Sequence, residues 1–241
     1  MSGLQRFERK YLISLAEYHR LRARLPLHFE PDAYTRKQAL GRYLVRSIYY
    51  DTRDYRAYYE KEDGNYSRIK LRLRAYTDDP STNDIVSVEL KTRNGNVMTK
   101  HTSRVPHNHY ECFHGTGHWP VDADPVTAEF ARLVRVRSLI PMVLVQYSRE
   151  GYQARSSRSV RLTLDHGVES SRARSLFPRQ VILRPHRPRS VILEIKTSDG
   201  EPRWLTDFVR DHQLKLMSNS KYVQGIEVIR PNMVTPREAA P

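Results

Sequence analysis

Between Arg68 and Tyr76 the chain alternates basic and apolar residues without interruption. In a β-strand successive side chains point to opposite faces, so one face of this segment carries cations and the other carries apolar residues. The basic row is Arg68, Lys70, Arg72 and Arg74, and the apolar row is Ile69, Leu71, Leu73 and Ala75. For a single strand the ordinary interpretation is a solvent-exposed row. The alternative is a row that lines a cavity holding something strongly negative.

Further strand-like segments repeat this pattern, and the repetition favours the cavity. Their charged faces hold Glu8 and Lys10; Glu89 and Lys91; Lys100 and Arg104; Arg161 and Asp165; and Glu194 and Lys196, while Arg149 closes another strand. An apolar row lies opposite each charged row. A sheet with apolar residues outward must be covered by helices, and its charged side must enclose ions. The pattern therefore predicts an α+β fold in which a closed antiparallel β-barrel with a hydrophilic interior carries helices on its outside.

The local patterns give the expected order of elements. Strands are predicted at about 7–15, 42–51, 66–76, 85–92, 97–105, 139–152, 160–168 and 191–198. Helices are predicted at about 14–25, 54–62, 125–137 and 203–212, and a final short element opens at Ser220-Lys221-Tyr222. The segments 27–40 and 172–189 are expected to be irregular, the second as a long edge hairpin or loop.

Individual residues set several of these boundaries. Ser14 and Glu17 have the spacing of a capping box, and Pro26 is expected to help end the helix that follows. Asp54 is the expected cap of the next helix. The triplet Asn94-Gly95-Asn96 predicts a tight hairpin turn between two strands. No linker divides the chain convincingly, so we expect one domain over 1–230 and a frayed tail over 231–241.

Charge and cysteine content restrict the partner and the compartment. A formal net charge of +14 in 241 residues implies a polyanionic partner. The cations lie within strands rather than in a basic helix or tail, which disfavours nucleic acid. The lone Cys112 excludes an internal disulfide, and we see no secretory signal and no run of the ~20 apolar residues that a membrane span needs. We expect a cytoplasmic protein.

One other cluster suggests a metal. His107, His109, Cys112, His114 and His118 lie close together in the sequence. Their spacings fit no standard zinc site, and one cysteine supplies little thiolate. We therefore interpret the segment 107–124 mainly as a histidine-rich loop, with structural zinc as the minor alternative.

Phosphate chains are the ligand that suits a basic interior. Buried lysine and arginine are costly without compensation, and each phosphate group accepts several charge-assisted hydrogen bonds. The carboxylates Glu8, Glu89 and Glu194 need a separate reason. They can supply hard oxygen ligands to Mg²⁺ or Mn²⁺, or they can form ion pairs with neighbouring lysines, and the sequence leaves both open.

Six short motifs, in order, resemble the VTC-type polyphosphate polymerase domain. This is the catalytic domain of the vacuolar transporter chaperone complex and its bacterial relatives, within the triphosphate tunnel metalloenzymes (CYTH-like). The motifs are Arg6-x-Glu8-x-Lys10-Tyr11, Ser47-Ile48-Tyr49-Tyr50-Asp51-Thr52, Lys70-Leu71-Arg72-Leu73-Arg74, Val88-Glu89-Leu90-Lys91, Leu193-Glu194-Ile195-Lys196 and Ser220-Lys221-Tyr222. The match spans about residues 6–228, and the resemblance implies an eight-stranded antiparallel tunnel.

The resemblance also implies roles for individual residues. Positions that match phosphate or nucleotide contacts of the family are Lys10, Arg72, Arg74, Lys91, Lys100, Arg149, Arg161 and Lys221, and Lys70 shares the same basic face. Glu194 matches the metal-binding glutamate, and Glu8 compares with the acidic residues of the first strand. Ser218 departs from the family, which often has a basic residue there; Lys215 is a possible substitute.

The implied activity is transfer of the ATP γ-phosphate to inorganic polyphosphate, with Mn²⁺ or Mg²⁺. Export of the product would then need a separate membrane-protein partner. The alternatives are a tunnel-family triphosphatase, which hydrolyses inorganic triphosphate or a nucleoside triphosphate, and a protein that binds polyphosphate or nucleic acid without catalysis. Both enzymes would use the same cations and metal, and differ in whether phosphate or water is the acceptor.

Overall fold

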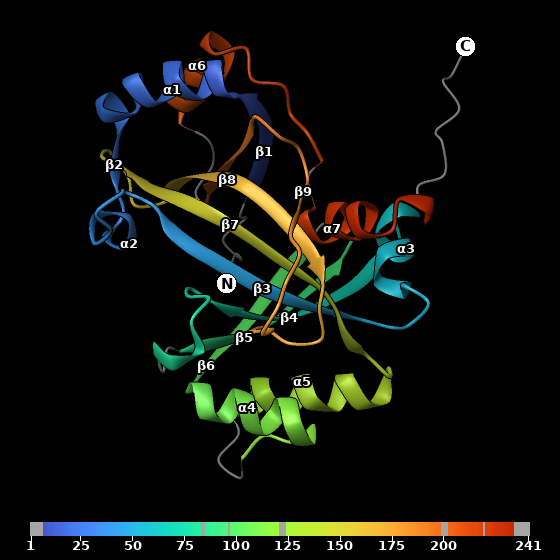
Figure 1. The fold of residues 1–241 in the computed structure, drawn as a ribbon. Helices are drawn as coiled ribbons and strands as arrows, with labels where there is room; N and C mark the ends of the chain where they lie inside the picture. The colour runs from blue at the N-terminus through green and yellow to red at the C-terminus, as the bar shows by residue number, and fades with distance from the viewer. Residues whose placement is uncertain are drawn as a thin grey trace. The chain divides into compact units, whose positions relative to one another are not determined.

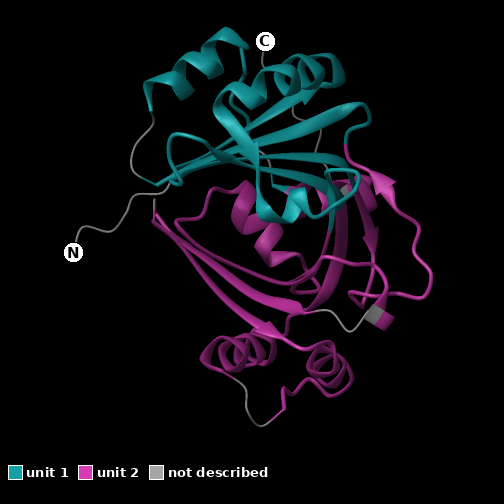
Figure 2. Ribbon diagram, turned by 90° about the vertical axis from the view of Figure 1, so that its left-hand side faces the viewer, with its two compact units in different colours: residues 1–44, 147–168, 187–220 teal, residues 45–146, 169–186, 221–241 magenta. Residues whose placement is uncertain are grey.

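The computed structural model describes residues 7–82, 85–95, 97–120, 124–198, 202–218 and 220–233. Two compact units, each assembled from separated segments, make up the chain (Figure 2). Unit 1 comprises residues 1–44, 147–168 and 187–220, and unit 2 comprises residues 45–146, 169–186 and 221–241. Each unit has its own hydrophobic core and its own charged strand face, and they are described separately.

Unit 1 is built on the strands β1, Phe7–Ser14, and β10, Ser190–Thr197, and on the first part of β8, Val160–Arg172. All pair antiparallel, with β10 in the middle. The short β2, Phe29–Pro31, pairs with the end of β7, Ile140–Ala154. The helices α1, Leu15–His28, and α6, Arg203–Asp211, pack on the apolar strand faces through a core of aliphatic and aromatic residues (Figure 1).

Unit 2 contains a meander of antiparallel strands, β3 to β6. Their bounds are Tyr43–Asp51 for β3, Ser67–Ala75 for β4, Val86–Asn94 for β5 and Val97–Val105 for β6. The helices are α3, Arg56–Glu62; α4, His107–Thr116; α5, Pro125–Val136; and α7, Lys221–Ile229. Short elements complete the description: β9, Arg184–Pro185, on β8, the 3-10 turns Pro80–Thr82 and Pro231–Met233, and, in unit 1, α2, Ala33–Arg36.

The apolar row of β4 is buried as the alternation predicts. Leu71, Leu73 and Ala75 lie in one core with residues of α4 and α5, among them Phe113 and Phe130. Figure 1 shows α4 and α5 together against β5 and β6. Because this face is sealed by helices, the alternate residues of the strands form the opposite, charged face. Strand parity therefore places the cations correctly.

The predicted closure into an eight-stranded barrel is not observed. Within the described residues, β1 and β6 are the two ends of the strand order, and the sheet counts ten strands because β2 and β9 join it. A closed barrel needs its end strands to pair with each other. β6 instead exposes most of its length from Val97 to Thr102, with polar and charged residues typical of an edge strand. The large antiparallel sheet and the outer helices are confirmed, whereas the closure is not.

Three local predictions were wrong. Pro26 lies inside α1, which continues to His28, because the buried residues Leu25 and Phe29 anchor the chain on both sides of the proline. The segment 27–40 contains β2 and α2 rather than only irregular chain. The histidine-rich segment begins with a helix, α4, because Tyr110 and Phe113, one turn apart, bury their rings in the unit 2 core.

A fourth correction concerns the start of α3. Asp54 does not cap this helix: its N-cap is Tyr55, which has a left-handed backbone (φ 61°) and forms no capping hydrogen bond through its side chain. The carboxylate of Asp51 instead accepts hydrogen bonds from the backbone N–H groups of Ala57 at 2.8 Å and Tyr58 at 3.3 Å. The predictions for Arg6, Asn96 and the tail beyond Met233 lie outside the described residues.

Candidate functional site

The charged face of unit 2 is a grid of side chains across the strands β3 to β6. Its rows are Lys70, Lys91 and Lys100; Tyr49, Arg72, Glu89 and Thr102; and Ser47, Arg74, Ser87 and Arg104. Residues directly opposite each other in an antiparallel pair have Cβ atoms about 5 Å apart. These three rows hold six cations and one carboxylate.

Glu89 is the centre of this grid. Glu89 is only 3% exposed. Arg72 donates to Glu89 Oε2 from Nε at 2.9 Å and from Nη2 at 2.6 Å, and Lys100 Nζ lies 2.9 Å from the same oxygen. Arg74 Nε lies 3.8 Å from Oε1. Burial would raise the pKa of Glu89, but these three cations outweigh it and hold the pKa well below its usual range.

Tyr49 connects this grid to helix α7. Its hydroxyl accepts a hydrogen bond from Arg72 Nη1 at 2.9 Å. Burial acts to raise the pKa of Tyr49, yet the charges of Arg72, Arg74 and Lys221 lower it, so Lys221 acts electrostatically on the same group. Tyr222 follows Lys221 in α7, and the ammonium of Lys70 lies 5.4 Å from the centre of the Tyr222 ring. Helix α7 therefore brings Lys221 to this face.

Unit 1 carries a second charged face, on β1, β10 and β8. Its rows are Glu8, Lys196 and Arg161; and Lys10, Glu194 and Thr163. Lys10 Nζ lies 2.8 Å from Glu8 Oε1, and Lys196 Nζ lies 2.6 Å from Glu194 Oε1. Cations and carboxylates alternate here, in contrast to the unit 2 grid.

Two further predicted cations of unit 1 have carboxylate partners that are distant in sequence. Arg149 binds the fully buried Asp165 through two hydrogen bonds, of 2.6 and 2.8 Å. Burial lowers the pKa of Arg149, but Asp165 more than compensates and raises it well above the ordinary value. Arg161 Nη2 is 3.5 Å from Asp32 Oδ2.

The unit 1 face also has donors that suit a hard divalent cation. Glu194 is only 5% exposed. Thr163 lies directly opposite it on β8, and the Thr163 hydroxyl oxygen is buried and forms no hydrogen bond with the described residues. Carboxylate and hydroxyl oxygens, completed by water and substrate phosphates, are the ligands that Mg²⁺ accepts. No group of three or more His, Cys, Asp or Glu residues in the described part of the chain could hold a metal by itself. The residues of this face fit a metal that is shared with a phosphate ligand.

The predicted site residues thus fall into two sets. Unit 2 brings together Lys70, Arg72, Arg74, Glu89, Lys91, Lys100 and Lys221. Unit 1 brings together Glu8, Lys10, Arg161 and Glu194, with Arg149 held by Asp165. Ser218 and Lys215 are both exposed.

Sequence reasoning missed several members of these faces. Tyr49 was visible only as an aromatic strand residue, and its contact with Arg72 depends on strand register. Asp32 lay in a segment predicted to be irregular. Asp51 was missed as the residue that caps α3 and accepts a hydrogen bond from the Tyr222 hydroxyl. The only signal for such pairs is a carboxylate within an otherwise apolar or basic segment.

Comparisons with known proteins found solved structures with a similar fold. A candidate adenylate cyclase from Bacillus halodurans has a similar fold, with 17% identity, a TM-score of 0.56, and coverage of 93% of this chain and 98% of that one. A Hippeastrum candidate adenylyl cyclase with a dominant triphosphatase activity is also similar, with 15% identity, a TM-score of 0.53, and coverage of 96% and 98%. Among curated proteins no sequence matches.

These solved structures share the fold of this chain. The family model described as the VTC domain matches residues 5–230, which is nearly the whole chain. This range includes every strand and helix of both charged faces. The chain belongs to the VTC domain family.

Proposed function

We propose that this protein is a polyphosphate polymerase that transfers the γ-phosphate of ATP to a growing inorganic polyphosphate chain. The observation that carries the proposal is the row of Lys70, Lys91 and Lys100 on the unit 2 face, where like charges stand directly opposite one another. Like charges in this position destabilise a sheet. A phosphate chain relieves the repulsion because its oxygens accept charge-assisted hydrogen bonds from several cations at once.

The residues of the unit 2 face would act by position and charge. Arg72 and Arg74 present guanidinium forks suited to two phosphate oxygens, and Lys91 and Lys100 supply point charges. Glu89 holds Arg72 in place, so its contacts favour the ion-pair interpretation of this carboxylate over metal binding. Phosphoryl transfer requires little covalent work from the protein, so orientation and neutralisation of charge are sufficient.

In the proposed reaction a terminal oxygen of the chain attacks the γ-phosphorus of ATP. The bond from that phosphorus to the β–γ bridging oxygen breaks, ADP leaves, and the chain gains one phosphate. On the unit 1 face, Glu194 with Glu8 would hold Mg²⁺ or Mn²⁺, which when bound supplies positive charge to the phosphate oxygens. Lys10, Arg149 and Arg161 would contact phosphates bound to the unit 1 face.

The second candidate is a triphosphatase. The same cations would hold a triphosphate while water, rather than a chain, attacks the terminal phosphorus. It is favoured by the fold shared with the Hippeastrum protein, for which triphosphatase activity dominates. The geometry of the basic face serves both reactions.

Product analysis separates the candidates. The purified protein is incubated with ATP and Mn²⁺ or Mg²⁺, with and without a short polyphosphate primer, and the products are resolved on a gel. The polymerase predicts ADP together with chains that lengthen over time. Free phosphate without chains would replace the polymerase with the triphosphatase, and tight binding of tripolyphosphate without turnover would leave a binding protein.

A further inference from the structure

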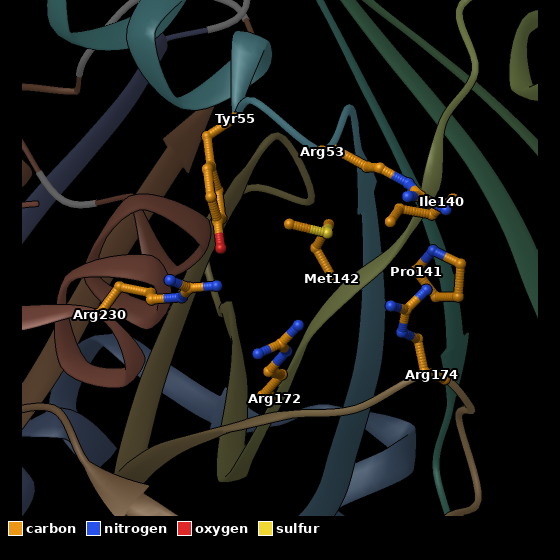
Figure 3. A pocket seen from close by; sticks show the side chains of 8 residues that line it. All are labelled: Arg53, Tyr55, Ile140, Pro141, Met142, Arg172, Arg174 and Arg230. Carbon is orange, nitrogen blue, oxygen red and sulfur yellow. The ribbon is translucent and has the colours of Figure 1, made fainter.

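Four arginines surround a pocket in unit 2 that is separate from the charged strand face. The pocket has a volume of about 210 Å³ and is lined by Arg53, Tyr55, Ile140, Pro141, Met142, Arg172, Arg174 and Arg230. Figure 3 shows Arg172, Arg230 and the Tyr55 ring on one side, and Arg53 and Arg174 beside Ile140 and Pro141 on the other. The four arginines come from different segments of unit 2. Arg53 follows β3, Arg172 ends β8, Arg174 lies in the loop after β8, and Arg230 follows α7.

Among the residues that the structure describes, no carboxylate neutralises this cluster. Within the described residues none of Arg53, Arg172, Arg174 and Arg230 forms an ion pair. Many other arginines of the chain do, as Arg72 does with Glu89 and Arg149 with Asp165. Four guanidinium groups around one concavity form a strong local positive potential, which attracts an anion.

The wall of the pocket is also preorganised. Tyr55 has a left-handed backbone with φ 61°, an uncommon conformation for a bulky residue. The surrounding structure maintains it through the Asp51 cap of α3. The guanidinium of Arg230 lies 5.7 Å from the centre of the Tyr55 ring, so a cation–π contact holds this arginine at the pocket.

We propose that this pocket is a second anion site, which binds a short segment of an inorganic phosphate chain. Arginine forks bind phosphate oxygens in pairs. A pocket of this size holds a few linked phosphates. Its lining has four arginines and a single aromatic residue, Tyr55, whose ring is already in contact with Arg230, so the site offers charge rather than a row of aromatic stacking platforms. Helix α7 spans about 12 Å from Lys221 to Ile229, which separates the pocket from Lys221 at the other end of the helix.

The proposal does not depend on catalysis and is tested by binding alone. Calorimetric titration with tripolyphosphate, without ATP or metal, is carried out on the full chain bearing Arg72→Ala, which weakens the strand face. We expect a binding event that remains in this variant and weakens at least ~10-fold when Arg172→Ala and Arg230→Ala are added, because each exposed charge-assisted contact is worth about a factor of several.

The matched control removes the same charge elsewhere in unit 2. Arg179 and Arg184 are exposed and do not line the pocket. With Arg179→Ala and Arg184→Ala on the Arg72→Ala background, the binding event should be retained within about twofold. An equal loss in both double variants, or no binding in the Arg72→Ala protein, would overturn the proposal. Equally strong competition by single-stranded RNA at the same phosphate concentration would overturn the assignment to inorganic chains.

Discussion

Arg72 is the residue on which most of the unit 2 face depends. It binds Glu89 and Tyr49 at once, with three hydrogen bonds of 2.6 to 2.9 Å. Its remaining exposure leaves the guanidinium accessible to a ligand, since the side chain is 24% exposed. It therefore combines contacts within the protein with partial exposure to solvent.

Replacing Arg72 tests this combination. Arg72→Ala should reduce the rate of phosphate release or transfer from ATP by about 10²–10³, as removal of a preorganised charge contact does. Arg72→Lys should not restore the rate, since lysine cannot contact Glu89, Tyr49 and a phosphate in the same geometry. Arg132→Ala, on the outer surface of α5, is the control for loss of one positive charge. Equal rates in Arg72→Ala and Arg132→Ala would show that the face is not used.

Glu150 is the corresponding buried acid of unit 1, with 1% exposure. Tyr18 and Tyr152 donate hydrogen bonds of 2.7 and 2.6 Å to it, and Arg42 Nε lies 2.8 Å from it. Burial raises its pKa, but the contacts with His166 and the tyrosines prevail and lower the pKa from 4.5 to about 2. The sequence predicted no role in phosphate chemistry for these contacts around Glu150. We expect them to stabilise unit 1.

A lowered pKa predicts acid sensitivity. The stabilisation from Glu150 is fully present above its unfolded pKa of about 4.5 and is lost as the pH falls through that value toward 2. The loss is at most on the order of 3 kcal/mol, and less because water reaches the partly exposed arginines around it. Denaturant titrations between pH 6 and pH 2.5 measure it. In Glu150→Gln this part of the slope should disappear; an unchanged slope would assign the acid sensitivity to other groups.

At the scale of elements, strand parity was predictable because it needs only the period of two. The sequence of β4 shows which residues are cations and which are core, and the register with β3, β5 and β6 then follows from hydrophobic burial. The capping box of α1 and the hairpin between β5 and β6 were predicted from residues close together in the sequence, and the structure confirms both. Features set by neighbours in sequence were therefore accessible.

Elements that depend on distant residues were not. Helix α4 lacks a side-chain cap, and only its packing against the unit 2 core shows that it is not a loop. The start of α3 is fixed by Asp51, which lies in the preceding strand rather than at the expected cap position. Such contacts have no fixed spacing, so no pattern in a single sequence reveals them.

The Asp51 contact gives a prediction for α3 and α7 together. Burial raises the pKa of Asp51, while the Tyr222 hydroxyl and the N–H groups of α3 act to lower it. Asp51→Ala should lower the free energy of unfolding by about 2–4 kcal/mol, since it leaves buried donors without an acceptor. Tyr222→Phe, which removes one donor, should cost about 1 kcal/mol. Chemical denaturation measures both, and a smaller loss in Asp51→Ala than in Tyr222→Phe would contradict this account.

At the scale of the whole molecule, the sequence predicted an α+β fold, the antiparallel sheet and the charged faces. It did not predict that the strand order ends at β1 and β6, because closure depends on the pairing of edges rather than on the residues of any one strand. The four-arginine pocket was also not predicted. Its residues lie in loops and element ends, where the charge has no periodicity. In the described residues no helix is long and apolar enough to cross a membrane.

The central claim is that the grid on β3 to β6 binds phosphate chains. A crystal structure of the full chain with tripolyphosphate tests it most directly. The account predicts phosphate oxygens about 2.7–3.2 Å from nitrogen atoms of Arg72, Arg74 and Lys91. A well-ordered tripolyphosphate bound elsewhere, with this face contacting only solvent, would contradict it.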